Sequence, residues 1–140
     1  MKRCVVDASV VAAAFFQEEH AKAAQALLAA ERDLLAPDLV YAEFTNVVWK
    51  RHRRGEIDDE EAAQLVADVL RLPLQITPAG ELAGAALELA LRTGRTVYDC
   101  LYLALAVKTR SRMICADLRL VNALAASPLE KHIAWIGKSR

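Results

Sequence analysis

Short apolar runs alternate with longer helix-forming segments along the whole of this 140-residue chain. The short runs are rich in Val, Ile, Leu and Cys and end close to a turn or helix signal, which is typical of strands buried on both faces. The predicted strands are 4–6, 34–36, 74–76, 112–115 and 133–136. The longer segments are rich in good helix formers and carry helix start and stop signals. The predicted helices are 9–16, 19–31, 37–54, 58–71, 77–94, 96–109 and 118–126.

Turn and cap residues divide these segments. Gly55 and Gly94 stand where a glycine usually ends a helix, and Asp58 with Glu61 forms a capping-box pattern at the start of another helix. No hairpin signal joins two strands, so each strand is expected to reach the next through a crossover. We therefore predict one α/β domain over residues 1–140, a three-layer α/β/α sandwich with a short, mostly parallel central sheet.

The composition supports a folded domain without a membrane segment. Hydrophobic residues make up 55% of the chain and charged residues 26%, which argues against disorder, and no apolar run approaches the length of a membrane span. Asp7 interrupts any signal-like core near the N-terminus, so we expect a cytoplasmic protein. The 18 basic and 18 acidic residues cancel, which argues against coating of nucleic acid by bulk charge. Two local basic patches remain, at 50–54 and 138–140.

The cysteines indicate neither disulfides nor zinc. Cys4, Cys100 and Cys115 lie among apolar residues without Cys-x-x-Cys spacing, so free buried thiols are expected. The three histidines have no metal-type spacing to them or to one another, so a zinc site is not supported.

Four carboxylates interrupt apolar runs, namely Asp7, Glu43, Asp99 and Asp117. A carboxylate taken out of water without a partner costs several kcal/mol or protonates. Asp7 and Asp117 follow predicted strands, and Glu43 and Asp99 lie in the first turns of predicted helices. In a parallel sheet those positions share the edge where ligands bind. A hard divalent cation would offset the repulsion among them, so we predict a metal site.

Each carboxylate has an ordinary alternative to weigh. Asp7, Asp99 and Asp117 are placed to cap helices, although Ser9 is able to take the capping role from Asp7. Glu43 lies past the capping turn, and its neighbours three and four residues away include no basic side chain, so no salt bridge within the helix explains it. Glu43 therefore carries the strongest indication of a functional site.

The ordered set of motifs resembles the PIN-domain family. The motifs are Asp7-Ala8-Ser9, Glu43-Phe44-Thr45-Asn46, Asp99-Cys100-Leu101-Tyr102-Leu103-Ala104 and Cys115-Ala116-Asp117. The resemblance covers the whole chain, at a length typical of VapC-type toxins of toxin–antitoxin pairs. It implies a Mg²⁺- or Mn²⁺-dependent endoribonuclease that cleaves structured RNA. It also implies a homodimer that is inhibited by a small antitoxin protein covering the active site.

The resemblance also implies roles for single residues. Asp7 and Asp99 match the lead metal ligands, Glu43 and Asp117 complete the acidic cluster, and the supporting residues are Ser9 and Asn46. The chain departs from the pattern at Cys115, where the family has a hydroxyl residue. A thiol is a weaker hydrogen-bond partner, which affects the positioning of Asp117.

The residues that are candidates for RNA contacts each have a structural alternative. Arg51, Arg53 and Arg54 are candidates for phosphate contacts, but basic residues near a helix C-terminus also complement its dipole. Trp49 and Tyr98 could stack on bases, although core or dimer packing is the alternative we favour.

Three rivals to a nuclease are considered. A phosphatase of the haloacid-dehalogenase class needs a second acid two residues after Asp7, where the chain has Ser9. A receiver domain needs an acidic pair at the first strand, which is absent. A PIN-like fold that only binds RNA or a protein partner is the third, and Cys115 is the residue that supports it.

Overall fold

The computed structural model describes residues 2–30 and 32–137 and contains a parallel sheet at the positions that the sequence predicts. The strands are β1 (Arg3–Val6), β2 (Asp33–Pro37), β3 (Leu74–Thr77), β4 (Arg112–Cys115) and β5 (Ile133–Trp135). All four strand pairs are parallel, in the order β3-β2-β1-β4-β5. The predicted sandwich is therefore confirmed, with a sheet that is parallel throughout.

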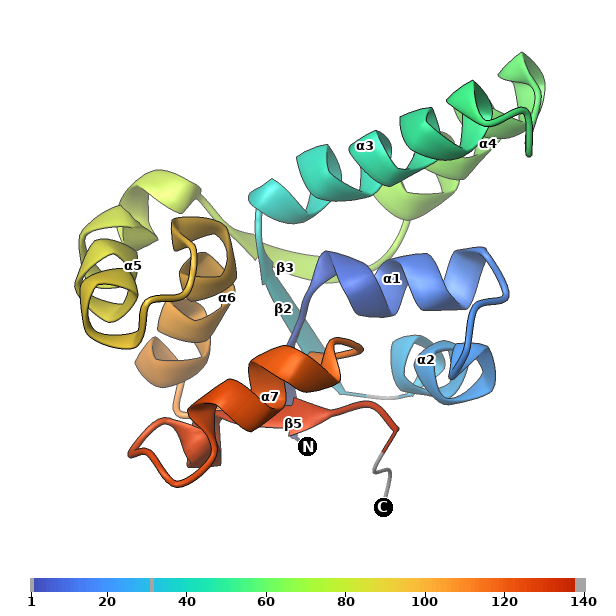
Figure 1. Cartoon of the computed structure of the whole chain (residues 1–140). Coiled ribbons are helices and arrows are strands. Elements are labelled where there is room, and N and C mark those ends of the chain that lie inside the picture. The colour runs from blue at the N-terminus through green and yellow to red at the C-terminus, as the bar shows by residue number, and fades with distance from the viewer. Residues whose placement is uncertain (1, 31, 138–140) are drawn as a thin grey trace.

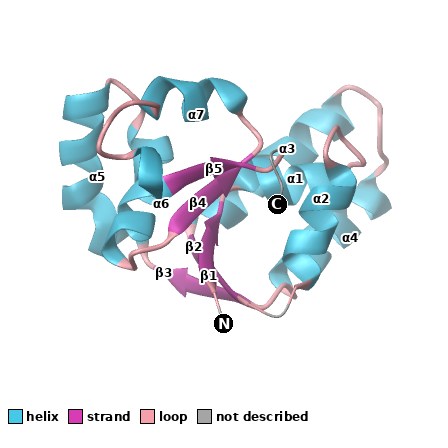
Figure 2. Ribbon diagram, turned by 90° about the horizontal axis from the view of Figure 1, so that it is seen from below, coloured by secondary structure: helices cyan, strands magenta, loops and turns pink. Residues whose placement is uncertain are grey.

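The helices connect these strands as crossovers. They are α1 (Ala8–Phe15), α2 (Ala21–Ala29), α3 (Leu39–Arg53), α4 (Asp59–Leu70), α5 (Ala79–Thr93), α6 (Val97–Lys108) and α7 (Leu118–Leu124), with a 3₁₀ turn η1 (Glu130–His132) before β5. In both views α5 and α6 lie on one side of the sheet, with α1 and α2 on the other (Figures 1 and 2). Within the described ranges, every helix is too short or too polar to span a lipid bilayer.

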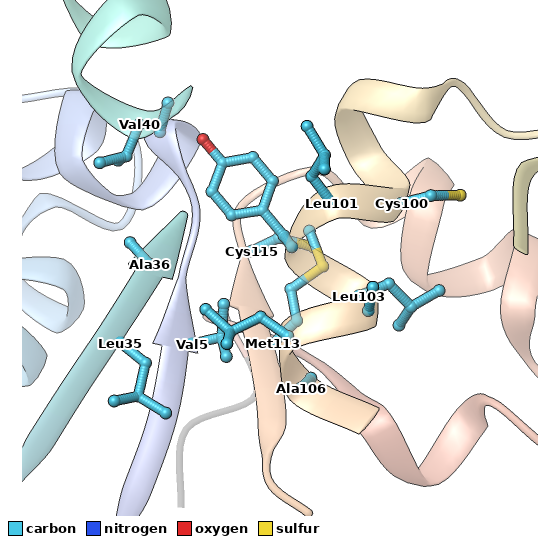
Figure 3. Close-up of a cluster of buried hydrophobic side chains, with 14 of the residues drawn as sticks. Val5, Leu35, Ala36, Val40, Cys100, Leu101, Leu103, Ala106, Met113 and Cys115 are labelled. Carbon is cyan, nitrogen blue, oxygen red and sulfur yellow. The ribbon is translucent and has the colours of Figure 1, made fainter. Parts of the chain in front are cut away.

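Neighbouring side chains of the central strands β1 and β2 pack into two different hydrophobic clusters. Val5, Leu35 and Met113 face the core that α6 fills, and Figure 3 shows Val5 and Met113 beside Leu103 of that helix. Cys4, Val6 and Leu34 face the other way, toward Leu27 and Leu28 of α2. A strand buried on both faces needs apolar residues at every position, which is why the runs are short and continuous.

Strand order reverses between β1 and β4, which are neighbours in the sheet although they lie far apart in the sequence. The chain proceeds from β1 outward through β2 to β3, then returns on the other side to β4 and β5. A reversal of this kind opens a crevice at the carboxyl ends of the two central strands. Asp7 directly follows β1, and Asp117 lies two residues after the end of β4.

The capping box of α4 is confirmed, since the Glu61 amide donates to Asp58 and the Asp58 amide donates to Glu61. The second predicted helix starts two residues late, at Ala21, because His20 has a left-handed backbone with φ 71°. Its predicted end, Glu31, lies outside the described residues, as does the basic patch 138–140.

The last predicted helix is also shorter than expected. It ends at Leu124 because the chain turns with φ 63° at Ala126. The three cysteines are free and buried, as expected.

Candidate active site

Asp7 joins the ends of the two central strands through Ser9. The Asp7 carboxylate caps α1, accepting hydrogen bonds from the amides of Ser9 (3.1 Å) and Val10 (3.3 Å) and from the Ser9 hydroxyl (2.5 Å). The Ser9 Oγ in turn accepts from the amide of Ala116, beyond β4, at 2.9 Å. Of the two candidate caps, Asp7 is the one that caps α1, and Ser9 instead links Asp7 to the β4–α7 loop.

Asp7 carries the most perturbed carboxylate in this cluster. Its side chain is only 7% exposed, and burial raises its pKa to about 7. Hydrogen bonds from Ser9 and Val10 lower the pKa, and the negative charges of Glu43 and Asp99 raise it. Capping alone would favour the charged form, so the raised value indicates that the cap is outweighed by burial and by neighbouring carboxylates.

Glu43 projects from α3 toward α6. The Tyr102 hydroxyl donates a 2.6 Å hydrogen bond to Glu43 Oε1, across 59 positions in the sequence. Burial raises the pKa of Glu43, the Tyr102 hydrogen bond lowers it, and the charge of Asp99 raises it. Tyr102 is therefore a structural partner for Glu43 that the neighbours within its own helix could not reveal. The Tyr in the motif that begins at Asp99 was the available signal.

We expect Tyr102→Phe to destabilise the fold by about 1.5 kcal/mol at neutral pH, because it removes a hydrogen bond to a charged, half-buried group. The buried ring is kept, so packing should change little. Urea unfolding checks this, with Tyr98→Phe as the matched control, since Tyr98 is 61% exposed. If Tyr102→Phe loses no more stability than the control, then the Tyr102–Glu43 hydrogen bond does not stabilise the fold.

Asp99 and Asp117 complete the cluster from α6 and α7. The Thr96 side chain caps α6, accepting a hydrogen bond from the Asp99 amide at 3.1 Å. Burial raises the pKa of the Asp99 carboxyl, Arg95 lowers it, and the charge of Asp117 raises it. Asp117 caps α7 and accepts from the Arg119 amide at 3.0 Å. The four carboxylates are therefore coupled electrostatically. The charges of Glu43 and Asp99 raise the pKa of Asp7, and the charge of Asp117 raises the pKa of Asp99.

The family model of the PIN domain matches residues 4–124, which include all four carboxylates. The chain belongs to the PIN-domain family. It is 32% identical over 126 residues to the ribonuclease VapC3 of Pyrobaculum aerophilum, covering 89% of this chain and 96% of that protein.

Several solved structures share the fold of this chain at lower sequence identity. A crystal structure from Pyrobaculum aerophilum covers 98% of this chain and 85% of its own, with a TM-score of 0.66 and 22% identity. A toxin–antitoxin complex from Klebsiella pneumoniae covers 94% of this chain and 95% of its own (TM-score 0.61, 15% identity). VapBC2 of Rickettsia felis, bound to a DNA fragment from its promoter, covers 95% and 98% (TM-score 0.61, 15% identity).

The donor chemistry of this PIN domain fits a hydrated divalent ion. In the residues that the structure describes, no group of three His, Cys, Asp or Glu side chains is placed to hold a metal directly. Mg²⁺, however, commonly uses one or two carboxylates and keeps several waters. Carboxylates that raise one another's pKa, as Asp7, Glu43 and Asp99 do, gain most from a nearby cation.

Cys115, the departure from the family motif, still reaches the segment that holds Asp117. Its Sγ lies 3.6 Å from the backbone carbonyl oxygen of Asp117, and the thiol donates there. Burial, with the negative charge of Asp7 adding to it, raises the pKa of the thiol, so it stays protonated as a donor. The replacement therefore weakens, but keeps, a link between the end of β4 and Asp117.

The remaining predicted residues lie on α3, after Glu43 in the sequence. Asn46 is exposed, and no hydrogen bond in the described ranges joins it to a carboxylate. Arg51 is paired with Glu18 and Glu56 and lies over the ring of Phe16 at 4.5 Å. These contacts give Arg51 a structural role between α3 and the end of α1.

Arg53 and Arg54 remain accessible on the same helix end. Arg53 lies over the Trp49 ring at 4.6 Å, and Arg54 pairs with Glu56 at 3.3 Å. Trp49 is 52% exposed and Tyr98 is 61% exposed, so core packing was the wrong alternative for both. Arg53 with Trp49 is the pair on α3 that is best placed to meet a ligand.

Proposed function

We propose that this chain is a metal-dependent endoribonuclease that hydrolyses phosphodiester bonds in structured RNA. The mutual electrostatic influence of Asp7, Glu43, Asp99 and Asp117, two of which follow the carboxyl ends of β1 and β4, carries the proposal. The similarity to VapC3 and the presence of toxin–antitoxin complexes among the structural neighbours support it. Such an enzyme would be the toxin of a type II toxin–antitoxin pair and would act in the cytoplasm on RNA.

In the proposed mechanism, Asp7 and Asp99 would hold the metal, and Glu43 and Asp117 would complete its surroundings. When bound, Mg²⁺ or Mn²⁺ supplies positive charge that stabilises the developing charge on the phosphate. Tyr102 occupies Oε1 of Glu43, so we assign Oε2 as the atom that accepts the proton of the attacking water. The raised pKa of Glu43 brings this base closer to neutral pH, where proton acceptance is most effective.

We propose two protein partners, an antitoxin and a second copy of this chain, and the toxin–antitoxin complex among the structural neighbours supports the first. The proposed antitoxin would cover the carboxylates beyond the ends of β1 and β4. A homodimer is supported by apolar side chains that the fold leaves uncovered on α5 and at the start of α6. Leu87 and Leu91, one turn apart on α5, are 52% and 76% exposed, and Tyr98 is 61% exposed. Burial of such side chains favours association.

An RNA-cleavage assay with Mn²⁺ tests the proposal. Asp7→Asn and Asp99→Asn should each lower the cleavage rate at least about a hundredfold, because each removes a carboxylate that would hold the metal ion, and the positive charge of that ion stabilises the phosphate transition state. Glu88→Gln is the matched control, an exposed carboxylate on α5, and should cleave like the wild type. Cleavage that survives both substitutions, or that survives chelation, would contradict the mechanism.

The second candidate is a PIN-like module that binds RNA or a protein without cutting. The buried thiol of Cys115, in place of a hydroxyl, is the observation that favours it. The Cys115→Ser variant distinguishes the nuclease from the binding module. A gain in cleavage from an active wild type fits the enzyme, and binding without cleavage in both proteins fits the module.

A further inference from the structure

A cavity lies at the edge of the sheet opposite the carboxylates. It has a volume of about 470 Å³ and opens where α6 ends, where β4 begins and where η1 precedes β5. It is lined by Val107, Arg110, Ser111, Arg112, Lys131 and His132. In Figure 1 the end of α6 and the segment before β5 lie together, away from the start of α3.

The lining of this cavity is strongly basic. Arg110, Arg112 and Lys131 are permanent cations, His132 adds an imidazole, and no acidic residue lines the space. Among the ion pairs formed by the described residues, none involves these three cations, whereas Lys108, just outside, pairs with Glu81. The whole chain has no net charge, so this concentration of positive charge is local. Cations held together without counter-charges favour an anionic ligand.

Backbone hydrogen bonds hold the turn that contains Arg110, and the backbone conformation at this position is unfavourable for arginine. Arg110 has a left-handed backbone, with φ 55°. Its amide donates to the Val107 carbonyl and the Ser111 amide donates to the Ala106 carbonyl, the pattern in which glycine usually ends a helix. Arginine costs more than glycine in this conformation, so a glycine at this position should leave the turn intact while removing the guanidinium.

Further hydrogen bonds fix the floor of the cavity. The hydroxyl oxygens of Thr109 and Ser111 lie 2.8 Å apart, and His132 Nδ1 lies 2.9 Å from the Ser111 carbonyl oxygen. A carbonyl oxygen only accepts, so Nδ1 carries the proton. The loop after α6 and the turn before β5 are therefore held together, and the cations of both segments stay on the same cavity.

We propose that this cavity binds phosphate groups. Lysine and arginine are the usual phosphate ligands, and the lining offers no Phe, Tyr or Trp ring on which a nucleobase would stack. The phosphate that is cut cannot lie in this cavity, because the two sites are at opposite ends of β4. Arg112 is at the start of the strand, and Asp117 of the carboxylate cluster follows its end. The phosphates come either from the backbone of a bound RNA or from a free phosphate compound. The proposal goes beyond the proposed ribonuclease function and does not require it.

Binding is measured with EDTA present, so that neither metal nor cleavage contributes. Calorimetry with pyrophosphate measures binding of a free phosphate compound. Fluorescence anisotropy with a labelled RNA measures binding of phosphates in an RNA backbone. Arg112→Gln and Arg110→Gly are the cavity variants, and Arg92→Gln, an exposed arginine on α5, is the matched control. Arg110→Gly also keeps the turn, so its melting temperature should not fall.

The proposal expects each cavity variant to weaken phosphate binding about tenfold, with a change below about twofold in the control. If RNA is the source, RNA affinity falls and the slope of log K against log salt decreases by about one per variant. If the source is a free compound, pyrophosphate binding falls and RNA binding does not. Either result supports the proposal. Pyrophosphate and RNA binding that match the control in both cavity variants would overturn it, whether or not the chain cleaves RNA.

Discussion

In metal-free buffer at pH 8, the Asp7→Asn variant is expected to be more stable than the wild type. The pKa of Asp7 rises from 3.8 to about 7 in the folded chain, because the carboxyl group is buried among other carboxylates. A folded-state pKa above the unfolded value means that folding favours the protonated acid. That contribution is complete below pH 4 and is lost as the pH rises through 7.

The expected size follows from the shift. About three pKa units correspond to about 4 kcal/mol, so the stability of the wild type relative to the variant should fall by about this amount between pH 4 and pH 8. Asparagine keeps the cap of α1, since it is as good an N-cap as aspartate. The remaining difference between the two proteins is then the charge.

Denaturant unfolding at pH 4 and pH 8, with EDTA, measures this prediction. The two proteins should unfold at similar midpoints at pH 4, and the variant should unfold at a clearly higher midpoint at pH 8. Glu88→Gln serves as the exposed control, with little change expected at either pH. If Asp7→Asn is the less stable protein at pH 8, then Asp7 is held by its hydrogen bonds more strongly than it is repelled.

The order of strands and helices was predictable because each local signal agrees with the whole fold. Continuous apolar runs, such as Cys4-Val5-Val6, become strands that are buried on both faces. The sharp turn that delays α2 was not predictable, because Gln17 and His20 adopt positive φ without a glycine to mark the place. There tertiary packing overrides the preference of the residue for ordinary backbone angles.

The site was predictable only as a set of residue types at one edge. Parallel topology places Asp7 and Asp117 near each other, and the sequence alone indicates that much. The partner of Glu43 lies on another helix, and the role of Ser9 depends on a backbone amide 107 positions away. Contacts across such distances require the packed chain. They explain why a residue such as Glu43 looked unpaired in its own helix.

Mg²⁺ or Mn²⁺ is expected to stabilise the wild type and to stabilise Asp99→Asn much less. An ion that binds only the folded chain contributes about 2.7 kcal/mol at a hundred times its dissociation constant. The charge of Asp99 raises the pKa of Asp7 and Glu43. The carboxylate of Asp99 therefore contributes to the repulsion among these groups that a bound ion would offset. Thermal unfolding with increasing metal, reversed by EDTA, measures the effect, with Glu88→Gln as the control that should respond like the wild type.

The metal response should also depend on pH, which links it to the first prediction. Below pH 7 Asp7 holds a proton that a metal must displace, so the gain at pH 5.5 should be smaller than at pH 8. At pH 8 and high metal concentration, the advantage of Asp7→Asn should shrink or reverse, because the variant lacks the charge that the ion needs. An equal response of wild type, Asp7→Asn and Asp99→Asn would place any bound metal away from this cluster. The proposed mechanism would then lose its metal site, whereas phosphate binding at the opposite edge would be unaffected.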